Sequence, residues 1–175
     1  MKTQEIKTGD VLLYRSSSFL SRIIRFFSGK YSHASIVFDS WYKCFVAEAD
    51  KEGVVPNSIE DSIKGCEILV LRPKFEFDIK LLDQLITSHL GKHRYNFFLL
   101  IIMQLVYQLS NKKIWLYWGK NGKQLRKTVC GQFVAYIYNE YSEGKNFIDW
   151  SKATPQSLFE SDLFEHFELE LEPKI

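Results

Sequence analysis

Features that mark several classes of protein are missing from this sequence. Its 175 residues include only three cysteines, an odd number that argues against a full disulfide framework and fits a reducing compartment. We therefore expect Cys44 and Cys66 to be free, buried thiols rather than a disulfide pair. The formal net charge of +2 is too small to indicate a nucleic-acid partner. No repeat, linker or low-complexity segment divides the chain, so we expect one domain over residues 1–175.

The sequence also offers no clear membrane span or signal peptide. The most apolar run, residues 95–109, is about fifteen residues long, whereas a membrane-spanning helix needs about twenty. A helix in the protein core is therefore the better prediction for this run. The first seven residues contain no apolar stretch of the signal-peptide type, which by default indicates a cytoplasmic protein.

Motifs for binding phosphate or metal are missing as well. Gly119 and Gly122 lack the spacing of a phosphate-binding loop. His89 and His93 are spaced like a helical metal-binding pair, but Gly91 between them should end the helix. We expect these histidines to lie at the surface, and we predict no metal and no cofactor.

What the sequence does contain predicts an α+β domain with a mainly antiparallel sheet. Aromatic residues make up 15% of the chain, which favours a packed globular protein. Helical spacing of apolar residues, with capping residues at the ends, is found at 19–28 and 79–90, and the same spacing recurs after Cys130 as far as Tyr141. Strand-like patterns occur at 11–14, 32–38, 42–49, 67–71 and, as an acidic edge strand, 167–172.

Cys130 is the first candidate for chemistry. Helical spacing begins at or just before it, so its sulfur should lie at a helix N-terminus, where the backbone favours negative charge. This position lowers the pKa of a cysteine and favours the nucleophilic thiolate. The small Gly131 would let a substrate carbonyl approach closely. A lone cysteine on a helix is more often a small buried apolar residue, so the hypothesis needs a histidine and an orienting group.

The hairpin of residues 32–49 supplies both. If its turn is centred between Ser40 and Trp41, residues whose numbers sum to 81 face each other, and His33 faces Glu48. A carboxylate beside a histidine fixes the tautomer and orientation of a general base. The turn lacks an Asn-Gly pair, so a bulge could bring Asp50 opposite instead. The plainer alternative is an exposed histidine at a strand end.

Several motifs together resemble the circularly permuted branch of the NlpC-like papain superfamily, the YiiX-like amidases and peptidases. The matching residues are GDVLL at 9–13, YSHASIV at 31–37, Glu48, Tyr95, CGQFV at 130–134 and TPQSLF at 154–159. In unpermuted members the cysteine helix comes first, and here it follows the histidine strand. The resemblance implies a permuted papain-like fold with the cysteine-bearing helix packed against the sheet. The long gap before Cys130 predicts a helical, basic and aromatic insertion around residues 97–127.

Residue by residue, the resemblance implies Cys130 as the nucleophile, His33 as the acid and base, and Glu48 as the group orienting His33. It also implies that Tyr95 contributes a hydroxyl to the oxyanion or substrate site, although a packing role fits that residue equally well. The predicted activity is cysteine-dependent cleavage of an amide bond through a thioester acyl-enzyme, with cell-wall-type peptides as the substrate class.

Two other functions stay open. A lipid-directed thiol hydrolase or acyltransferase is favoured by the apolar run 95–109 and the basic, aromatic segment 111–127, which could contact lipid or a membrane surface. A solvated loop is the plainer interpretation of that segment. The other alternative is a catalytically silent binding protein with the same fold.

Overall fold

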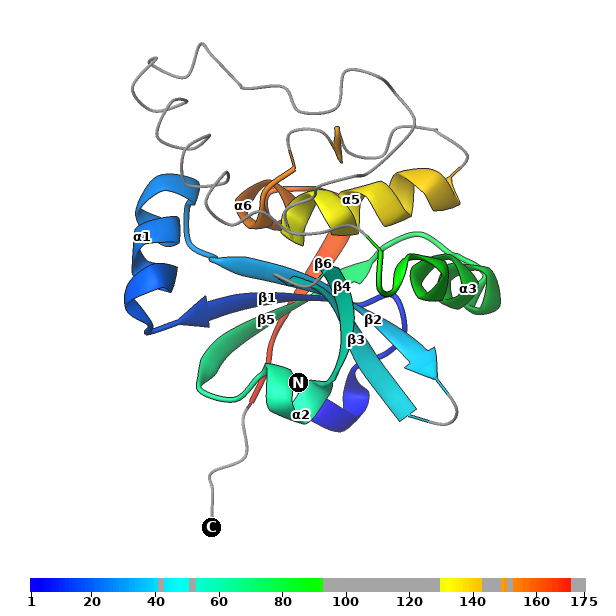
Figure 1. The fold of residues 1–175 in the computed structure, drawn as a ribbon, viewed down its shortest axis with the longest axis horizontal. Helices are drawn as coiled ribbons and strands as arrows, with labels where there is room; N and C mark the ends of the chain where they lie inside the picture. The colour runs from blue at the N-terminus through cyan, green and yellow to red at the C-terminus, as the bar shows by residue number, and fades with distance from the viewer. Residues whose placement is uncertain (41–42, 51–52, 93–129, 143–148, 151–152, 171–175) are drawn as a thin grey trace.

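Six strands form one antiparallel sheet in the order β4-β3-β2-β1-β5-β6 (Figure 1). The computed structural model describes residues 1–40, 43–50, 53–92, 130–142, 149–150 and 153–170. The α+β class and the antiparallel sheet predicted from the sequence are confirmed. The strands are β1 Val11–Ser16, β2 His33–Ser40, β3 Lys43–Asp50, β4 Gly53–Ser58, β5 Cys66–Pro73 and β6 Phe164–Glu168.

Helices cover both faces of the sheet. The helical elements are a 3-10 turn at Thr3–Glu5, α1 Phe19–Ser28, α2 Ile59–Ser62, α3 Ile79–His89, α5 Cys130–Tyr141 and α6 Pro155–Phe159. Helices α3 and α5 contact each other and pack against β2, and α6 contacts α5. The short α2 contacts β3 and β4 on the other side of the sheet (Figure 1). None of the helices within the described residues is long and apolar enough to cross a membrane.

Capping residues fix where the first long helices begin. The Ser18 hydroxyl accepts a hydrogen bond from the Ser21 backbone N–H, and Asp78 accepts two from the first turn of α3. Gly29 follows α1 with a φ of 115°, a conformation that favours glycine. Both helices occupy the segments predicted for them, because caps act locally.

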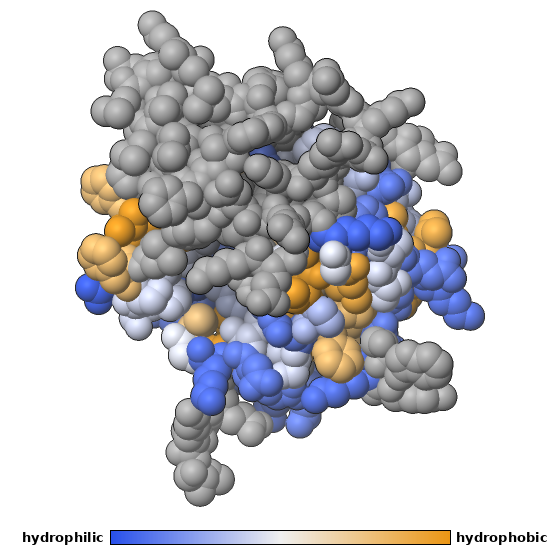
Figure 2. Space-filling model, viewed as in Figure 1, coloured by the Kyte–Doolittle hydropathy of each residue, from blue (hydrophilic) through white to orange (hydrophobic). Residues whose placement is uncertain are grey.

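The apolar side chains of α1 that the structure describes are only partly buried. Phe19 is 79% exposed and Phe26 is 84% exposed. Figure 2 shows apolar side chains on the surface over α1, at the left edge of the view. Large exposed apolar groups in one place indicate a contact surface.

The alternation of side chains along the strands gives the sheet two apolar clusters. One cluster lies under α3 and α5 and contains Val11, Leu13, Ile36, Phe133 and Ile137 among others. The other lies on the opposite face and contains Ile6, Leu12, Tyr14, Val37, Val46 and Val70 among others. Both faces of the central strands are therefore covered by other parts of the chain, which shield side chains on either face from water.

Two strands differ from the sequence analysis. No strand was predicted at β4, which contains Pro56, a residue that usually argues against a strand. β4 is an edge strand, the position in a sheet where proline is tolerated. The acidic strand predicted at 167–172 is β6, which lies at the other edge but spans Phe164–Glu168. The predicted insertion around 97–127 lies outside the described residues.

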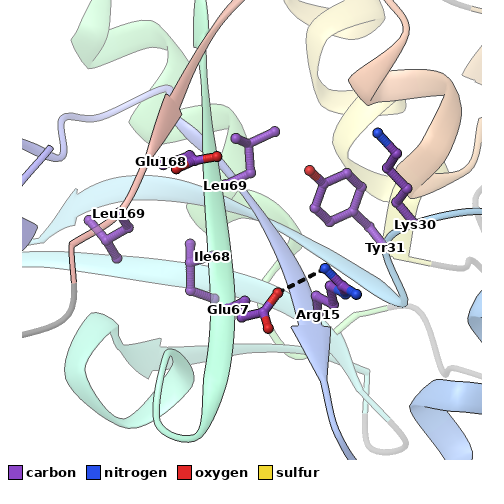
Figure 3. A pocket seen from close by; sticks show the side chains of 8 residues that line it. All are labelled: Arg15, Lys30, Tyr31, Glu67, Ile68, Leu69, Glu168 and Leu169. Carbon is purple, nitrogen blue, oxygen red and sulfur yellow. Dashed lines mark hydrogen bonds and ion pairs between the residues drawn. The ribbon is translucent and has the colours of Figure 1, made fainter.

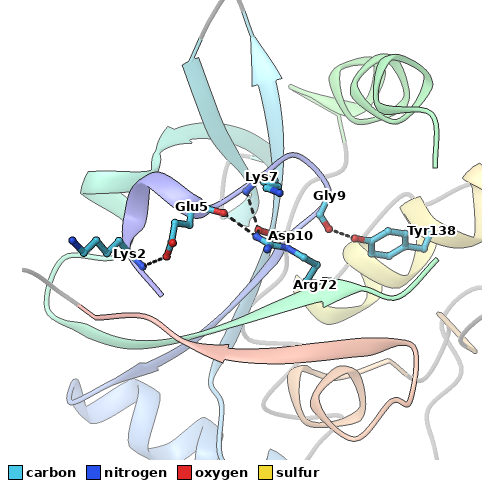
Figure 4. Close-up of polar contacts among 7 residues, drawn as sticks. All are labelled: Lys2, Glu5, Lys7, Gly9, Asp10, Arg72 and Tyr138. Atoms are coloured by element: carbon cyan, nitrogen blue, oxygen red, sulfur yellow. Dashed lines mark hydrogen bonds and ion pairs between the residues drawn. The ribbon is translucent and has the colours of Figure 1, made fainter. Parts of the chain in front are cut away.

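A buried ion pair fixes β1 beside β5. Asp10 is 1% exposed, and Arg72 donates two hydrogen bonds to its carboxylate, with N–O distances of 2.9 and 2.7 Å (Figure 4). The Lys7 backbone N–H donates a third at 2.8 Å. On the neighbouring Gly9, the carbonyl oxygen accepts a hydrogen bond from the Tyr138 hydroxyl of α5. The turn before β1 thus holds both the sheet and the cysteine-bearing helix.

Candidate active site

Cys130 is the first residue of α5 and is 4% exposed. α5 packs against β2, and the sulfur lies beside Ala34, the second residue of that strand. Backbone hydrogen bonds from Ala34 and Gly131 reach the sulfur and favour its thiolate. The structure therefore places Cys130 at a helix start, as predicted, in a setting that suits a negatively charged sulfur.

Gly131 has a different role from the one predicted. A Cβ atom on Gly131 would lie 2.7 Å from the carbonyl carbon of Thr154 and 3.0 Å from the nitrogen of Pro155. These are backbone atoms at the start of α6, and they cannot move aside as a flexible side chain would. Glycine is needed here so that α5 can pack against α6, and the space beside it is not open to a substrate.

The predicted register of the hairpin was wrong by two residues. Ser35 pairs with Glu48, and Ser40 pairs with Lys43, so facing residues sum to 83 rather than 81. The pairs between these two are continuous, without a bulge. The side chain of Asp50, the alternative carboxylate, lies outside the described residues.

Glu48 nevertheless lies next to His33, because a shift of two residues keeps both side chains on the same face of the sheet. Nε2 of His33 is 3.7 Å from Oε2 of Glu48. The His33 side chain is 28% exposed, so the alternative of a fully solvated strand-end histidine is excluded. His33 is the first residue of β2, and from this strand end its ring contacts Glu48 as well as Cys130 on α5.

The charges of the three groups reinforce one another. Burial would lower the pKa of His33, but the Cys130 sulfur and the Glu48 carboxylate outweigh burial, and the pKa is raised. Burial would raise the pKa of Cys130, but the charge and hydrogen bond of His33 outweigh it, and the pKa is lowered. The pKa of Glu48 is lowered despite burial, chiefly by the neighbouring imidazole of His33 and also by the hydrogen bonds from Ser62 and Asn57. The arrangement favours a thiolate–imidazolium pair beside a carboxylate.

Comparison with known proteins shows what this architecture is similar to. No protein-family profile matches the sequence, and no curated protein matches it. Among solved structures, the metalloprotein yiiX from Escherichia coli O157:H7 matches with a TM-score of 0.67 and 17% sequence identity. The match covers 94% of this chain and 97% of the yiiX chain. The chain has a yiiX-like fold.

The sequence analysis also singled out Tyr95, two further histidines and two further cysteines. Tyr95 and His93 lie outside the described residues. His89 is 9% exposed rather than at the surface, because its Nδ1 lies 2.8 Å from the Leu85 carbonyl oxygen and its Nε2 lies 3.4 Å from Glu140. Both Cys44 and Cys66 are free, but they are half-buried rather than buried as predicted.

Four polar residues around Glu48 were missed by the sequence analysis. They are Tyr14 on β1, Ser35 on β2, Asn57 on β4 and Ser62 on α2. Tyr14 was assigned only to a buried strand, although pairing of β1 with β2 sets it opposite His33. A correct strand pairing could have found Tyr14, but the approach of α2 has no local marker in the sequence.

A separate pocket of about 320 Å³ opens where β1 ends and the antiparallel β5 begins (Figure 3). Both signs of charge line it, and Nη1 of Arg15 pairs with Glu67 at 3.0 Å. Tyr31, two residues before His33, also contributes to the wall. None of the residues that line this pocket belongs to the Cys130 site just described.

Proposed function

We propose that this chain is a cysteine hydrolase that cleaves an amide bond, with a permuted papain-like organisation of its site. The observation that carries the proposal is the contact of His33 with both Cys130 and Glu48, with pKa shifts of opposite direction in the histidine and the cysteine. A nucleophile, a base within hydrogen-bonding reach and a group orienting that base are the parts needed for nucleophilic catalysis. The chain order, with His33 before Glu48 and Cys130 last, supports the permuted resemblance.

In the first half of the reaction, the Cys130 sulfur attacks the carbonyl carbon of the amide and a C–S bond forms. The backbone N–H of Cys130, the first described residue of α5, is suited to stabilise the oxygen that becomes negative. The imidazolium of His33 then gives its proton to the leaving nitrogen as the C–N bond breaks. The products are a free amine and a thioester on Cys130.

In the second half, a water molecule attacks the thioester carbon. His33, now neutral, takes a proton from this water, and Glu48 stabilises the imidazolium that forms. The C–S bond breaks, the carboxylic acid leaves, and Cys130 returns to the thiolate beside His33. Peptides of the cell-wall type are the substrate class suggested by the family resemblance.

The description of yiiX as a metalloprotein raises the question of a metal here. The carboxylate oxygens of Glu48 accept hydrogen bonds from Ser62 and Asn57, and Nε2 of His33 faces the same carboxylate. Within the described ranges, no group of three or more His, Cys, Asp or Glu side chains is arranged to hold a metal ion. This donor set does not fit a metal, and no step above runs through one.

The proposal is tested by the pH dependence of cysteine alkylation. Cys130 is more buried than the half-buried Cys44 and Cys66, so absolute rates would mix access with ionisation, whereas the midpoint of each pH profile reports ionisation. The profile for Cys130 with iodoacetamide should have its midpoint below the ordinary thiol value of 9.0. The midpoints for Cys44 and Cys66 should lie above the ordinary thiol value, because burial raises their pKa values.

The reaction itself is tested by intact-mass detection of a covalent adduct after incubation with amide, ester and lipid probes. The expected result is an acyl adduct from amide probes in the wild type and none in Cys130→Ala. A Cys130 profile that coincides with those of Cys44 and Cys66, with no adduct, would instead identify a silent binding protein of the same fold.

A lipid-directed thiol enzyme is the second candidate, and exposed side chains of α1 favour it. Phe19, Arg22 and Phe26 are all exposed and lie at positions i, i+3 and i+7, on one face of the helix. Aromatic and cationic side chains on one helix face suit an anionic membrane surface. The segments that first suggested a lipid role, 95–109 and 111–127, lie outside the described residues.

Flotation with anionic liposomes tests this candidate. Binding at low salt and release at high salt are expected, and the double change Phe19→Ser with Phe26→Ser should abolish flotation. Leu81→Ser is the matched control, since Leu81 is a 51% exposed apolar residue on a different helix. Protein that stays unbound at both salt concentrations would leave amide hydrolysis of soluble peptides as the better account.

A further inference from the structure

The hydroxyl of Tyr14 lies at the centre of a buried hydrogen-bond network on the Glu48 side of the sheet. Tyr14 is 4% exposed, and its oxygen lies 2.6 Å from the Ser35 hydroxyl and 2.6 Å from the Ser62 hydroxyl. It also lies 3.3 Å from Oε1 of Glu48. Ser62 donates to the same Oε1, and Nδ2 of Asn57 donates to Oε2 at 3.3 Å.

The number of protons available sets the direction of this network. Each hydroxyl has one proton. That of Ser62 goes to Glu48, so the tyrosine proton serves both the short contact with Ser62 and the longer hydrogen bond to Oε1 of Glu48. Ser35 then donates to the tyrosine oxygen. The protons of Ser35, Tyr14 and Ser62 all point along one chain toward the carboxylate, an arrangement in which each hydrogen bond strengthens the next.

The network also keeps the carboxylate in one orientation. Oε1 is held by Ser62 on α2, while Oε2 receives Asn57 from β4 and faces Nε2 of His33. Donors on α2 and β4 therefore fix the Glu48 carboxylate, and only Oε2 faces the histidine. Burial and the charge of Glu48 raise the pKa of Tyr14, so its hydroxyl remains a proton donor.

We propose that Tyr14 and Ser62 are positioning residues, which together hold the Glu48 carboxylate against His33 and thereby sustain the charge pair of His33 with Cys130. The proposal rests on the cysteine-hydrolase function inferred above. Neither residue touches the reacting atoms. Their effect reaches Cys130 through Glu48 and then His33.

The substitution Tyr14→Phe isolates the hydroxyl. The ring of Tyr14 contacts the imidazole of His33, with centroids 5.2 Å apart and a tilt of 50°, and phenylalanine keeps that contact. Among the side chains that the structure describes, the titratable groups facing His33 are Glu48 on β3, Cys130 on α5, Tyr14 on β1 and, through its charge, Cys66 on β5. Cys66→Ala in all proteins compared removes the last of these as a source of ambiguity.

The experiment measures the midpoint of the iodoacetamide pH profile at Cys130 in the full chain, by peptide mass spectrometry. In Tyr14→Phe the midpoint should rise by about one pH unit, since a hydrogen bond to a charged group is lost and the imidazolium is less stabilised. Tyr138→Phe is the matched control. It also removes a buried tyrosine hydroxyl, but one that donates to the Gly9 carbonyl on the other side of the sheet, and its midpoint should equal that of the wild type.

A second pair of variants separates positioning from folding. Ser62→Ala should raise the Cys130 midpoint in the same direction as Tyr14→Phe, and Ser62→Thr, which keeps a hydroxyl, should return it to the wild-type value. These changes lie in the one-turn α2 and test the network even if Tyr14→Phe does not fold.

The outcomes distinguish the two proposals. A low midpoint in the wild type that neither Tyr14→Phe nor Ser62→Ala moves would overturn the positioning role and leave the cysteine-hydrolase proposal intact. An ordinary thiol midpoint in the wild type would overturn the proposed function, and the positioning role with it. A shift as large in Tyr138→Phe as in Tyr14→Phe would mean that the effect comes from general loosening of the fold.

Discussion

Asp10 and Glu48 are two carboxylates held within the same sheet, and their partners differ in kind. Asp10 accepts two hydrogen bonds from Arg72, whose charge is permanent at any working pH, and one from the Lys7 backbone (Figure 4). Glu48 accepts from neutral Ser62 and Asn57 and faces His33, whose charge can change.

This difference suggests two uses of a buried carboxylate. At Asp10 the partner is permanently charged, so the Asp10–Arg72 pair keeps one geometry and holds β1 beside β5. With a titratable partner, as at Glu48, neutral donors hold the carboxylate while the histidine gains and loses a proton. Substitutions at the first site should therefore affect stability, and those at the second should affect chemistry.

The largest effect is expected from Glu48→Gln. Turnover of an amide substrate should fall by on the order of 10²–10³-fold, less than in serine triads because a cysteine depends less on base strength for its nucleophile. Stability should fall by only about 1–2 kcal/mol, since the glutamine keeps the shape of the side chain but its amide nitrogen cannot accept from the donors around it. Steady-state kinetics and urea unfolding provide the measurements, and Asp50→Asn on the same strand is the control. A larger loss of turnover in Asp50→Asn would show that Asp50 is the orienting group.

The converse expectation applies to Arg72→Leu. Loss of the guanidinium leaves the Asp10 carboxylate buried without its cation, which should destabilise the fold by about 3 kcal/mol in urea unfolding. The Cys130 alkylation midpoint should not move. Arg15→Leu is the matched control, because the Arg15–Glu67 pair is exposed and should contribute about 1 kcal/mol or less. A shifted Cys130 midpoint in Arg72→Leu would show that the Asp10 ion pair affects the chemistry as well as the stability.

Gly131→Ala should affect both properties, because the glycine lies between the nucleophile and α6. The added methyl group meets backbone atoms of Thr154 and Pro155, so α5 and α6 must separate, at a cost of about 1–3 kcal/mol. The start of α5 should move relative to His33, and the alkylation midpoint of Cys130 should rise. Thermal unfolding and the pH profile measure the two effects.

The smallest effect is a pH dependence of stability. The folded-state pKa of Glu48 is lowered below 4.5, so its contribution to stability is present above pH 4.5 and is lost as the pH falls through the folded value. The difference in unfolding free energy between the wild type and Glu48→Gln should therefore shrink on acidification. A difference that stays constant from pH 6 to pH 3 would mean that Glu48 is not held in its charged form by the fold.

The parts of this fold that follow from nearby residues were predictable from the sequence. Ser18 and Asp78 cap the helices that follow them, and the cysteine helix begins at Cys130, because caps and apolar spacing act within a few residues. The three residues Cys130, His33 and Glu48 were selected from the sequence, and the structure brings them together. Their catalytic roles stay a prediction.

What escaped prediction depends on contacts between distant segments. The hairpin register had no turn signature at residues 41–42 to fix it, so a two-residue shift went undetected. Gly131 is required by Thr154, a residue far along the chain on another helix. Ser62 reaches Glu48 only because the one-turn α2 packs across β3 and β4. None of these contacts leaves a local pattern.

The order of the site residues along the chain also sets when the site can form during synthesis. His33 and Glu48 lie in the N-terminal hairpins, whose strands β1 to β4 pair with their sequence neighbours, while Cys130 lies more than eighty residues later. At roughly 5–20 residues per second, a ribosome needs about 4–16 s to add that stretch. The sheet can therefore begin to fold before the nucleophile exists. The Cys130 thiol gains its charged partner, His33, only when α5 packs against β2. A partly synthesised chain therefore does not yet carry the reactive Cys130 thiolate.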